Sequence, residues 1–395
     1  MFGAGCVVES LHMAFVGSMV MPSANKQSPS FTRTAKRGVV EIGTSVQTDD
    51  RYQLAMKAAK SFKPSPFRPI WWLANHHAQT IGGMVLPHSE QLSFDRERVP
   101  TRCGGFFDVD THHSGDGKSI VILYHGLEST SRGPHTRRIT KSLACRGHTV
   151  AAMNFRGCSG DVNTTLHDYH LGFTDDLATY VQILSSRVSD DTRIYLSGFS
   201  LGANVVLKFL AERSAEELAK FKIFGAAVQC VPFDPVACQA KLERGFSRLV
   251  YSRRFLKSLK KKAIEKSKLF PSEVNLKLIK AARTIADFDH AYIAPMFGFE
   301  SNTDYYRKND TRPLLSRINV PTLVVNALDD PFIEEKSLPN QEEVGKAPVK
   351  LVYTERGGHL GFIQSVRGES YAAAQTARFL EHLDGLHRGS SENNR

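Results

Sequence analysis

Cysteine is scarce in this sequence of 395 residues, and its six copies form no recognisable group. They are scattered along the chain, and no two of them have the C-x-x-C spacing. Neither a zinc site nor a disulfide framework is therefore indicated. We expect reduced, mostly structural thiols, as in an intracellular protein.

Long apolar runs are also missing, and none approaches the roughly 20 residues of a transmembrane helix. The apolar piece at residues 11–21 is too short, and no basic residue precedes it as in a secretory signal peptide. The sequence therefore predicts an intracellular protein that is either soluble or peripherally associated with a membrane.

Acidic residues are rare at the start of the chain, where Glu9 is the only one up to Val40, whereas Ser, Thr, Lys and Arg are frequent. This composition fits an organelle transit peptide, for a plastid or a mitochondrion. It fits an ordinary disordered extension equally well. We predict a disordered leader over residues 1–50 and leave its role in targeting open.

Acidic residues are outnumbered in the whole chain, with 40 Asp and Glu against 51 Lys and Arg, a formal net charge of +11. No nucleic-acid-binding motif accompanies this excess, so we do not expect nucleic acid as a partner. The first interpretation of its densest part, residues 257–268, is a solvated helix face, and the second is contact with an anionic lipid surface. The basic residues of that segment are Lys257, Lys260, Lys261, Lys262, Lys266 and Lys268.

What the sequence does contain is an alternation of apolar runs and helical patterns. Continuous apolar runs at 120–124, 150–155, 223–231 and 320–326 predict strands that are buried on both faces. Such alternation is typical of a mostly parallel sheet with helices on both faces. We predict one α/β domain over about residues 51–390.

The strand signal stops over about residues 232–313, where the sequence is polar and helical. An insertion at this point of a parallel sheet lies above the C-terminal ends of the strands, where the sites of such sheets form. We therefore predict a helical cap over the site. Phe297 and Phe299, in the last part of the insertion, are candidates to line an apolar pocket.

One stretch combines a strand pattern, a sharp turn and a helix pattern around Gly198-Phe199-Ser200-Leu201-Gly202. G-x-S-x-G in this context is typical of a nucleophile elbow, in which the serine has a strained backbone and the glycines let strand and helix approach. We predict that Ser200 is a nucleophile and that the Leu201 N–H stabilises an oxyanion. Phe199 is a candidate pocket residue.

A second oxyanion donor is predicted in His125-Gly126-Leu127, directly after the run at 120–124. The backbone N–H of Leu127 would pair with that of Leu201. His125 is a candidate pocket residue, but we favour a hydrogen bond from its side chain to its own loop over a direct catalytic role.

Candidates for an acid and a base follow later strands. Asp329 and Asp330 follow the run at 320–326, and His359 follows another apolar run. The chain order Ser…Asp…His, with each residue after a strand, is the arrangement of α/β-hydrolases. His359 would take the proton of Ser200, and one aspartate would orient the imidazole.

The choice between the two aspartates is open, with Asp329 favoured. It has the usual turn spacing after the preceding strand, whereas Asp330 precedes Pro331 and would cap or buttress the loop. His76 and His77 have no further histidine or carboxylate at ligand spacing, so we interpret them as structural. No metal and no organic cofactor are expected.

Several motifs together make the chain similar to the YheT-like branch of the α/β-hydrolases. This branch includes the plant embryogenesis-associated hydrolases, animal membrane-anchored lipases and yeast medium-chain acyl-ester enzymes. The resemblance covers about residues 65–385. The matching motifs are Asn75-x-His77-x-Gln79-Thr80, His125-Gly126-Leu127-Glu128, Asn154-Phe155-Arg156-Gly157-Cys158-Ser159-Gly160, Gly172-Phe173-Thr174-Asp175-Asp176-Leu177, Gly198 to Asn204, Asn326-Ala327-Leu328-Asp329-Asp330-Pro331 and Gly357-Gly358-His359.

The resemblance implies an eight-stranded, mostly parallel sheet with a cap, and a triad of Ser200, Asp329 and His359. It also implies hydrolysis of carboxylic esters, including phospholipid and acylglycerol esters, or acyl transfer to alcohols. We therefore expect a serine hydrolase of acyl or lipid esters that works through an acyl-Ser200 intermediate. An acyltransferase and a non-catalytic binding protein on the same scaffold are the alternatives.

Overall fold

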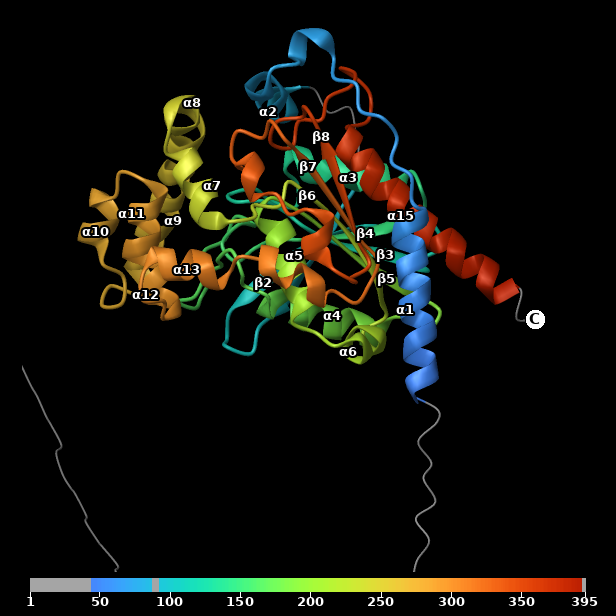
Figure 1. The fold of residues 1–395 in the computed structure, drawn as a ribbon. Coiled ribbons are helices and arrows are strands. Elements are labelled where there is room, and N and C mark those ends of the chain that lie inside the picture. The colour runs from blue at the N-terminus through green and yellow to red at the C-terminus, as the bar shows by residue number, and fades with distance from the viewer. Residues whose placement is uncertain (1–43, 87–91, 393–395) are drawn as a thin grey trace, which may run out of the picture. The chain divides into compact units, whose positions relative to one another are not determined.

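The computed structural model describes residues 44–86 and 92–392 (Figure 1). Residues 1–43, interpreted above as a leader or transit segment, lie outside the described residues. Helix α1 (Thr44–Ser61) begins before the expected end of the leader at residue 50. No helix within the described ranges has both the length and the apolar character that crossing a membrane requires.

An eight-stranded sheet forms the centre of the fold, with the strand order β1-β2-β4-β3-β5-β6-β7-β8. The pairs β1–β2 and β2–β4 are antiparallel, and all other neighbours are parallel. Every residue of β3, β4 and β7 is buried, as their continuous apolar sequences predict. The strands are β1 (Asp95–Pro100), β2 (Phe106–His112), β3 (Ser119–Tyr124), β4 (Thr149–Met153), β5 (Arg193–Phe199), β6 (Ile223–Gln229), β7 (Thr322–Ala327) and β8 (Val349–Thr354).

Helices cover both faces of this sheet (Figure 1). Helices α3 and α15 pack against each other on one face, and α5 packs against β5 and β6 on the other. The helices outside the cap are α1, α2 (His76–Val85), α3 (Pro134–Ala144), α4 (Asp175–Arg187), α5 (Leu201–Ala211), α6 (Ala215–Lys220), α14 (Gln341–Val344) and α15 (Tyr371–Glu392), with 3-10 turns η1 (Trp71–Leu73), η4 (Arg312–Arg317) and η5 (Glu335–Ser337).

All elements between β6 and β7, apart from the 3-10 turn η4, form the cap, and all of them are helical (Figure 1). Two of them are π-helical turns, which are rare in proteins but, where they occur, are often found at functional sites. The cap elements are α7 (Pro235–Leu242), α8 (Gly245–Ser247), η2 (Arg248–Ser252), α9 (Arg253–Leu269), α10 (Leu276–Ala281), α11 (Ile285–Phe288), η3 (Asp289–Ile293), α12 (Ala294–Phe297) and α13 (Asn302–Lys308). The predicted fold class, a mostly parallel sheet with helices on both faces and a helical cap, is confirmed.

Two of the sequence motifs meet in one buried ion pair. The Arg156 guanidinium, after β4, donates two hydrogen bonds to the Asp176 carboxylate at the start of α4, at 2.6 and 2.8 Å. Both side chains are 4% exposed, so each charge needs the other as its partner. This bidentate pair fixes the loop after β4 against α4 below the site.

Candidate active site

Ser200 sits at the turn between β5 and α5 with a strained backbone. Its φ of 55° and ψ of −124° are unusual for a residue with a side chain. The flanking glycines make this turn possible, because a Cβ on Gly198 would lie 2.6 Å from the Gly202 carbonyl oxygen. A Cβ on Gly202 would lie 2.4 Å from the carbonyl oxygen of His125. The turn therefore packs directly on the loop after β3.

His359 connects Ser200 to a buried carboxylate. Its Nε2 lies 3.0 Å from Ser200 Oγ, and its Nδ1 lies 2.8 Å from Asp330 Oδ2. Because a carboxylate accepts, Nδ1 carries the proton and Nε2 is left to accept from the serine hydroxyl. The ring of Phe332 lies against the imidazole, with 4.2 Å between centroids. The structure thus brings together a serine, a histidine and an aspartate in hydrogen-bond order.

The aspartate in this chain is Asp330, so the preference for Asp329 is wrong. Asp330 is fully buried, and its other oxygen accepts from the Phe332 N–H at 2.8 Å. Asp329 instead accepts from the Gly358 N–H at 2.9 Å, and burial raises the pKa of its carboxyl. The roles of the two aspartates are therefore the reverse of those expected. Asp329 stabilises the loop that contains Gly358 and His359, here called the histidine loop, and Asp330 faces the imidazole.

Helix α2 holds the histidine loop from the other side, a role that the sequence analysis missed. The hydroxyl of Thr80 accepts from the His359 N–H at 2.9 Å. The Gln79 side-chain oxygen accepts from the Ile363 N–H at 2.7 Å. Asn75 begins the helix by accepting from the N–H groups of His77 and Ala78. The sequence feature that could have indicated this role is the motif Asn75-x-His77-x-Gln79-Thr80, which brings several polar side chains together at the start of one short helix.

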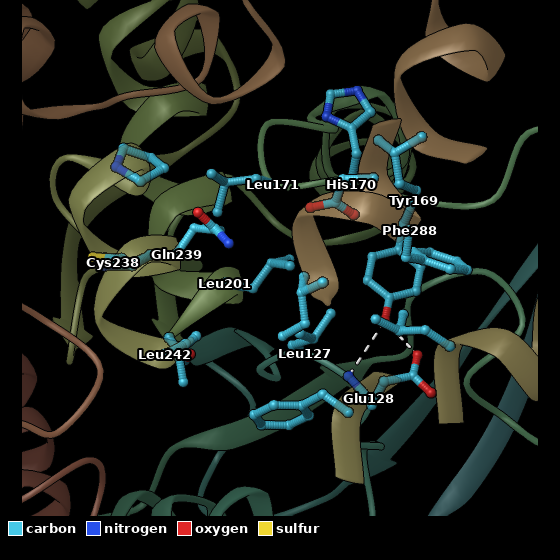
Figure 2. A pocket seen from close by; sticks show the side chains of 18 of the residues that line it. Leu127, Glu128, Tyr169, His170, Leu171, Leu201, Cys238, Gln239, Leu242 and Phe288 are labelled. Carbon is cyan, nitrogen blue, oxygen red and sulfur yellow. Dashed lines mark hydrogen bonds between the residues drawn. The ribbon is translucent and has the colours of Figure 1, made fainter. Parts of the chain in front are cut away.

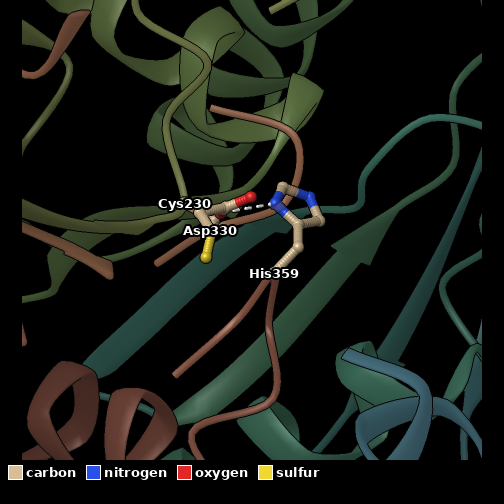
Figure 3. A group of neighbouring side chains, drawn as sticks. All are labelled: Cys230, Asp330 and His359. Carbon is tan, nitrogen blue, oxygen red and sulfur yellow. Dashed lines mark hydrogen bonds and ion pairs between the residues drawn. The ribbon is translucent and has the colours of Figure 1, made fainter. Parts of the chain in front are cut away.

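Cys230 lies next to the same aspartate and histidine (Figure 3). Its sulfur accepts from the Leu360 N–H at 3.3 Å. Burial and the negative charge of Asp330 raise the pKa of this thiol well above its usual value, which keeps it protonated. A metal ion requires the thiolate and a free imidazole nitrogen, whereas both nitrogens of His359 are already hydrogen-bonded. The cluster is therefore a hydrogen-bonded support for the histidine loop.

The two predicted oxyanion donors lie on either side of Ser200. The Leu201 N–H begins α5, and Leu127 follows Gly126, where a Cβ would lie only 3.1 Å from the serine Cβ. Neither amide donates a hydrogen bond to any residue of the described ranges. Both leucines line the cavity at Ser200. Two backbone donors without a partner at this place are what an oxyanion hole requires.

His125 does not line either cavity at Ser200, so the prediction that it is a pocket residue is wrong. Its Nδ1 donates to the Gly126 carbonyl at 2.8 Å, and its Nε2 accepts from the Phe155 N–H at 3.2 Å. Complete burial lowers its pKa to about 3, so the ring is neutral. His125 thus shapes the loop before Leu127, as the favoured interpretation stated.

Glu128 connects the loop after β3 to the cap through its side chain. Its backbone has a positive φ of 53°, and its side chain is 3% exposed. The carboxylate accepts from the Tyr169 hydroxyl at 2.8 Å, from the Lys262 ammonium at 2.9 Å and from the Ser258 hydroxyl. Lys262 and Ser258 belong to α9, so the position of the residue after Leu127 depends on the cap.

Ser200 and His359 line two cavities. The first, here called the cap cavity, has about 160 Å³ and lies between the sheet and the cap (Figure 2). Most of its walls are apolar, with Leu201, Leu242 and Phe288 among them. The second, here called the side cavity, has about 470 Å³ and lies between α2 and the cap.

Phe199 is buried and lines the side cavity, as predicted for a pocket residue. Phe297 and Phe299 line neither cavity, so the prediction that they line the pocket is wrong. Both rings lie behind His170, with centroid distances of 4.4 and 5.5 Å. His170 itself lines the cap cavity. The two rings therefore belong to the layer that packs behind the cavity wall, on either side of Gly298, whose φ is 71°.

Asp289 is an acidic group in the apolar cap cavity. It opens the π-helical turn η3, and its carboxylate accepts from the Tyr306 hydroxyl at 2.6 Å. Burial raises its pKa to about 7, because the charged form loses its water. The sequence analysis gave this residue no role.

A strained serine between a parallel strand and a helix, with a histidine that is hydrogen-bonded to both the serine and an aspartate, is typical of an α/β-hydrolase with a helical cap. Residues 115–363 match the family described as serine aminopeptidase, S33, and the chain belongs to this family.

The names of similar proteins support this assignment to the α/β-hydrolases. The Escherichia coli protein YheT is 31% identical over 79% of this chain and 91% of its own length. Human phospholipase ABHD3 is 24% identical over 80% of this chain and 79% of its own length. Monoacylglycerol lipase of Saccharomyces cerevisiae is 28% identical over 68% of this chain and 60% of its own length. The chain is thus a member of the esterase- and lipase-like α/β-hydrolases.

Replacing Gly202 tests the packing of the elbow. Gly202→Ala places a methyl group within 2.6 Å of the backbone oxygens of His125 and Tyr124, neither of which can move freely. We expect a loss of about 3 kcal/mol or more of unfolding free energy, measured by urea denaturation. Gly385→Ala in α15 is the matched control, because nothing lies within 4 Å of its Cβ. Equal stability of the two variants would contradict this packing.

The raised pKa of Asp289 predicts that the free energy of unfolding depends on pH. The carboxyl has a pKa of about 7 when folded and near 3.8 when unfolded, so folding is penalised increasingly as pH rises from about 4 through 7. At 1.36 kcal/mol per pKa unit the penalty reaches about 4 kcal/mol. Asp289→Asn, which still accepts from Tyr306, should therefore raise the Tm much more at pH 8 than at pH 4.5, where the penalty is only about 1 kcal/mol. A Tm difference that is equal at both pH values would show that Asp289 does not titrate there.

Proposed function

We propose that the protein is a serine hydrolase of carboxylic acyl esters that works through an acyl-Ser200 intermediate. The observation that carries this proposal is the hydrogen-bond chain from Ser200 through His359 to Asp330, at 3.0 and 2.8 Å. The chain ends at a serine with a strained backbone, and strain at such a position supports a catalytic role.

The first half-reaction follows from this geometry. His359 Nε2 takes the proton of the Ser200 hydroxyl while Oγ attacks the ester carbonyl. Asp330 holds the Nδ1 proton and stabilises the imidazolium. The N–H groups of Leu127 and Leu201 stabilise the oxyanion. His359 then gives its proton to the leaving alcohol.

The second half-reaction reverses these roles with water as the nucleophile. His359 takes a proton from water while the water oxygen attacks the acyl carbonyl. When the bond between the acyl carbon and Ser200 Oγ breaks, His359 returns that proton to Oγ, so the acid is released and the serine hydroxyl is restored. An alcohol in place of water would give acyl transfer, the alternative that the side cavity supports, because it provides about 470 Å³ beside Ser200 for an acceptor.

The cavities support an assignment of the substrate's two parts. The apolar cap cavity suits an acyl chain, and the side cavity, with polar residues such as Thr130 and Ser129 in its wall, suits the alcohol part. The names of the human and yeast relatives, a phospholipase and a monoacylglycerol lipase, support lipid esters as the substrate class. Glu128 would position Leu127 for the oxyanion when α9 is in place.

The first test is Ser200→Ala, with Ser186→Ala on the exposed side of α4 as control. We expect wild type and control to react with a fluorophosphonate probe and to hydrolyse part of a p-nitrophenyl ester series from acetate to palmitate. Ser200→Ala should lose labelling and about 10³-fold or more of kcat. An amino acid p-nitroanilide tests peptidase activity in the same assay. If folded wild type neither labels nor turns over any ester, the binding-protein alternative replaces this proposal.

The second test compares the neighbouring aspartates. Asp330→Asn offers the imidazole an amide in place of the carboxylate and should lower kcat by about 10³-fold or more. Asp329→Asn keeps an acceptor for the Gly358 N–H and should lower kcat by less than about tenfold. Steady-state kinetics on one soluble ester measures both. A larger loss in the Asp329 variant would contradict the assignment.

A further inference from the structure

The residues around the side cavity form an exposed apolar surface. Six of the ten large hydrophobic side chains recorded as exposed among the described residues belong to only two segments. One segment is η1 with the end of α2, and the other is α8 with η2. We call these six side chains the mouth face; they are Trp71, Trp72, Val85, Phe246, Leu249 and Val250.

The two segments lie next to each other in the fold. The rings of His77 and Phe246 are 4.3 Å apart, and His77 Nδ1 lies 3.2 Å from the Tyr251 hydroxyl. Met84 and Arg254 also approach each other, at 3.8 Å. The apolar side chains of the mouth face therefore belong to one region, although the segments are about 170 residues apart in the sequence.

The side cavity reaches the surface between these segments. Val85 is 69% exposed and Arg254 is also exposed, yet both line this cavity. Ser200 and His359 line its inner end. A molecule that enters from the mouth face thus arrives at the serine.

A basic rim borders the mouth face. From residue 244 to 264 the chain has eight Lys and Arg and no acidic residue. Six of these cations are exposed, and none of the six forms an ion pair with a residue of the described ranges. They are Arg244, Arg248, Arg253, Arg254, Lys257 and Lys261.

The rim differs from the segment 257–268 that the sequence analysis considered. Lys262 and Lys266 turn inward to Glu128 and Asp168, and Lys268 pairs with Glu265. Lys260 donates to the backbone carbonyls of residues 280 and 282. The charge available to a partner therefore lies at the start of α9 and before it, next to the exposed apolar residues.

We propose that the mouth face and its basic rim bind the surface of an anionic lipid bilayer. Tryptophan side chains prefer the headgroup level of a bilayer, and smaller apolar side chains beside them enter the acyl boundary. Unpaired Arg and Lys next to such side chains attract anionic headgroups. A lipid ester would then pass from the bilayer into the side cavity, a step that rests on the proposed function, whereas the binding does not.

The chain contains only two tryptophans, Trp71 and Trp72, so tryptophan fluorescence, excited selectively over that of tyrosine, reports on this part of the mouth face. The full-length protein is mixed with vesicles of diether phosphatidylcholine, with and without diether phosphatidylglycerol. We expect a blue shift of the emission and co-sedimentation with the anionic vesicles at low salt, both weakened by high salt. Diether lipids contain no ester, and Ser200→Ala should bind equally, so this result does not depend on turnover.

Three variants locate the binding surface by co-sedimentation: Trp71→Ser with Trp72→Ser, Phe246→Ser with Leu249→Ser, and Arg248→Glu with Arg253→Glu. Each should lower the partition coefficient by roughly tenfold or more. Leu269→Ser with Leu278→Ser is the matched control, because both leucines are exposed and Leu269 lies about 22 Å along α9 from Arg254. Thermal melting checks that every variant is folded.

Three outcomes would overturn the proposal. The first is no binding to anionic vesicles at low salt. The second is a loss of binding in the Leu269 and Leu278 control as large as in the mouth-face variants. The third is a dimer by light scattering that the tryptophan variant converts to a monomer, because the mouth face would then be an interface between two copies of the chain.

Discussion

The contact between the turn at Ser200 and the loop after β3 is the constraint on which the site depends. Gly202 lies so close to the Tyr124 and His125 carbonyls that no side chain fits between them. This approach holds Ser200 in its strained conformation and places it beside Leu127 at the same time. One packing contact thus positions both Ser200 and the loop that contains Leu127, and the parallel register of β3 and β5 supports it.

The cap is attached to this centre through buried charges. Glu128 binds Lys262 of α9, and Asp168 binds Lys266 of the same helix at 2.7 Å. Removing one partner of such a pair leaves an uncompensated buried charge, so the attachment is costly to break. The same pairs engage two lysines of α9 and leave the unpaired cations in the first half of α9 and in the segment before it. The position of the cap and the charge of its surface are therefore linked.

Much of the fold followed from patterns within the sequence. The continuous apolar runs predicted the central parallel strands, and the elbow pattern predicted the strand, turn and helix around Ser200. Side-chain contacts between distant segments did not follow. Phe297 and Phe299 are apolar and follow one another closely in the cap region, but they pack against His170 and do not line the cavity. Periodicity indicates which residues are buried and does not indicate which of two layers they occupy.

The sequence by itself determined the fold class, the order of serine, aspartate and histidine, and the place of each after a strand, because these depend on local pattern and chain order. Only the tertiary structure decided that Asp330 faces the imidazole and that Asp329 braces Gly358. Neighbouring residues in a loop point in different directions, and α2 and Cys230, both far away in the sequence, fix the histidine loop that meets them. Long-range packing, which no local pattern encodes, made that choice.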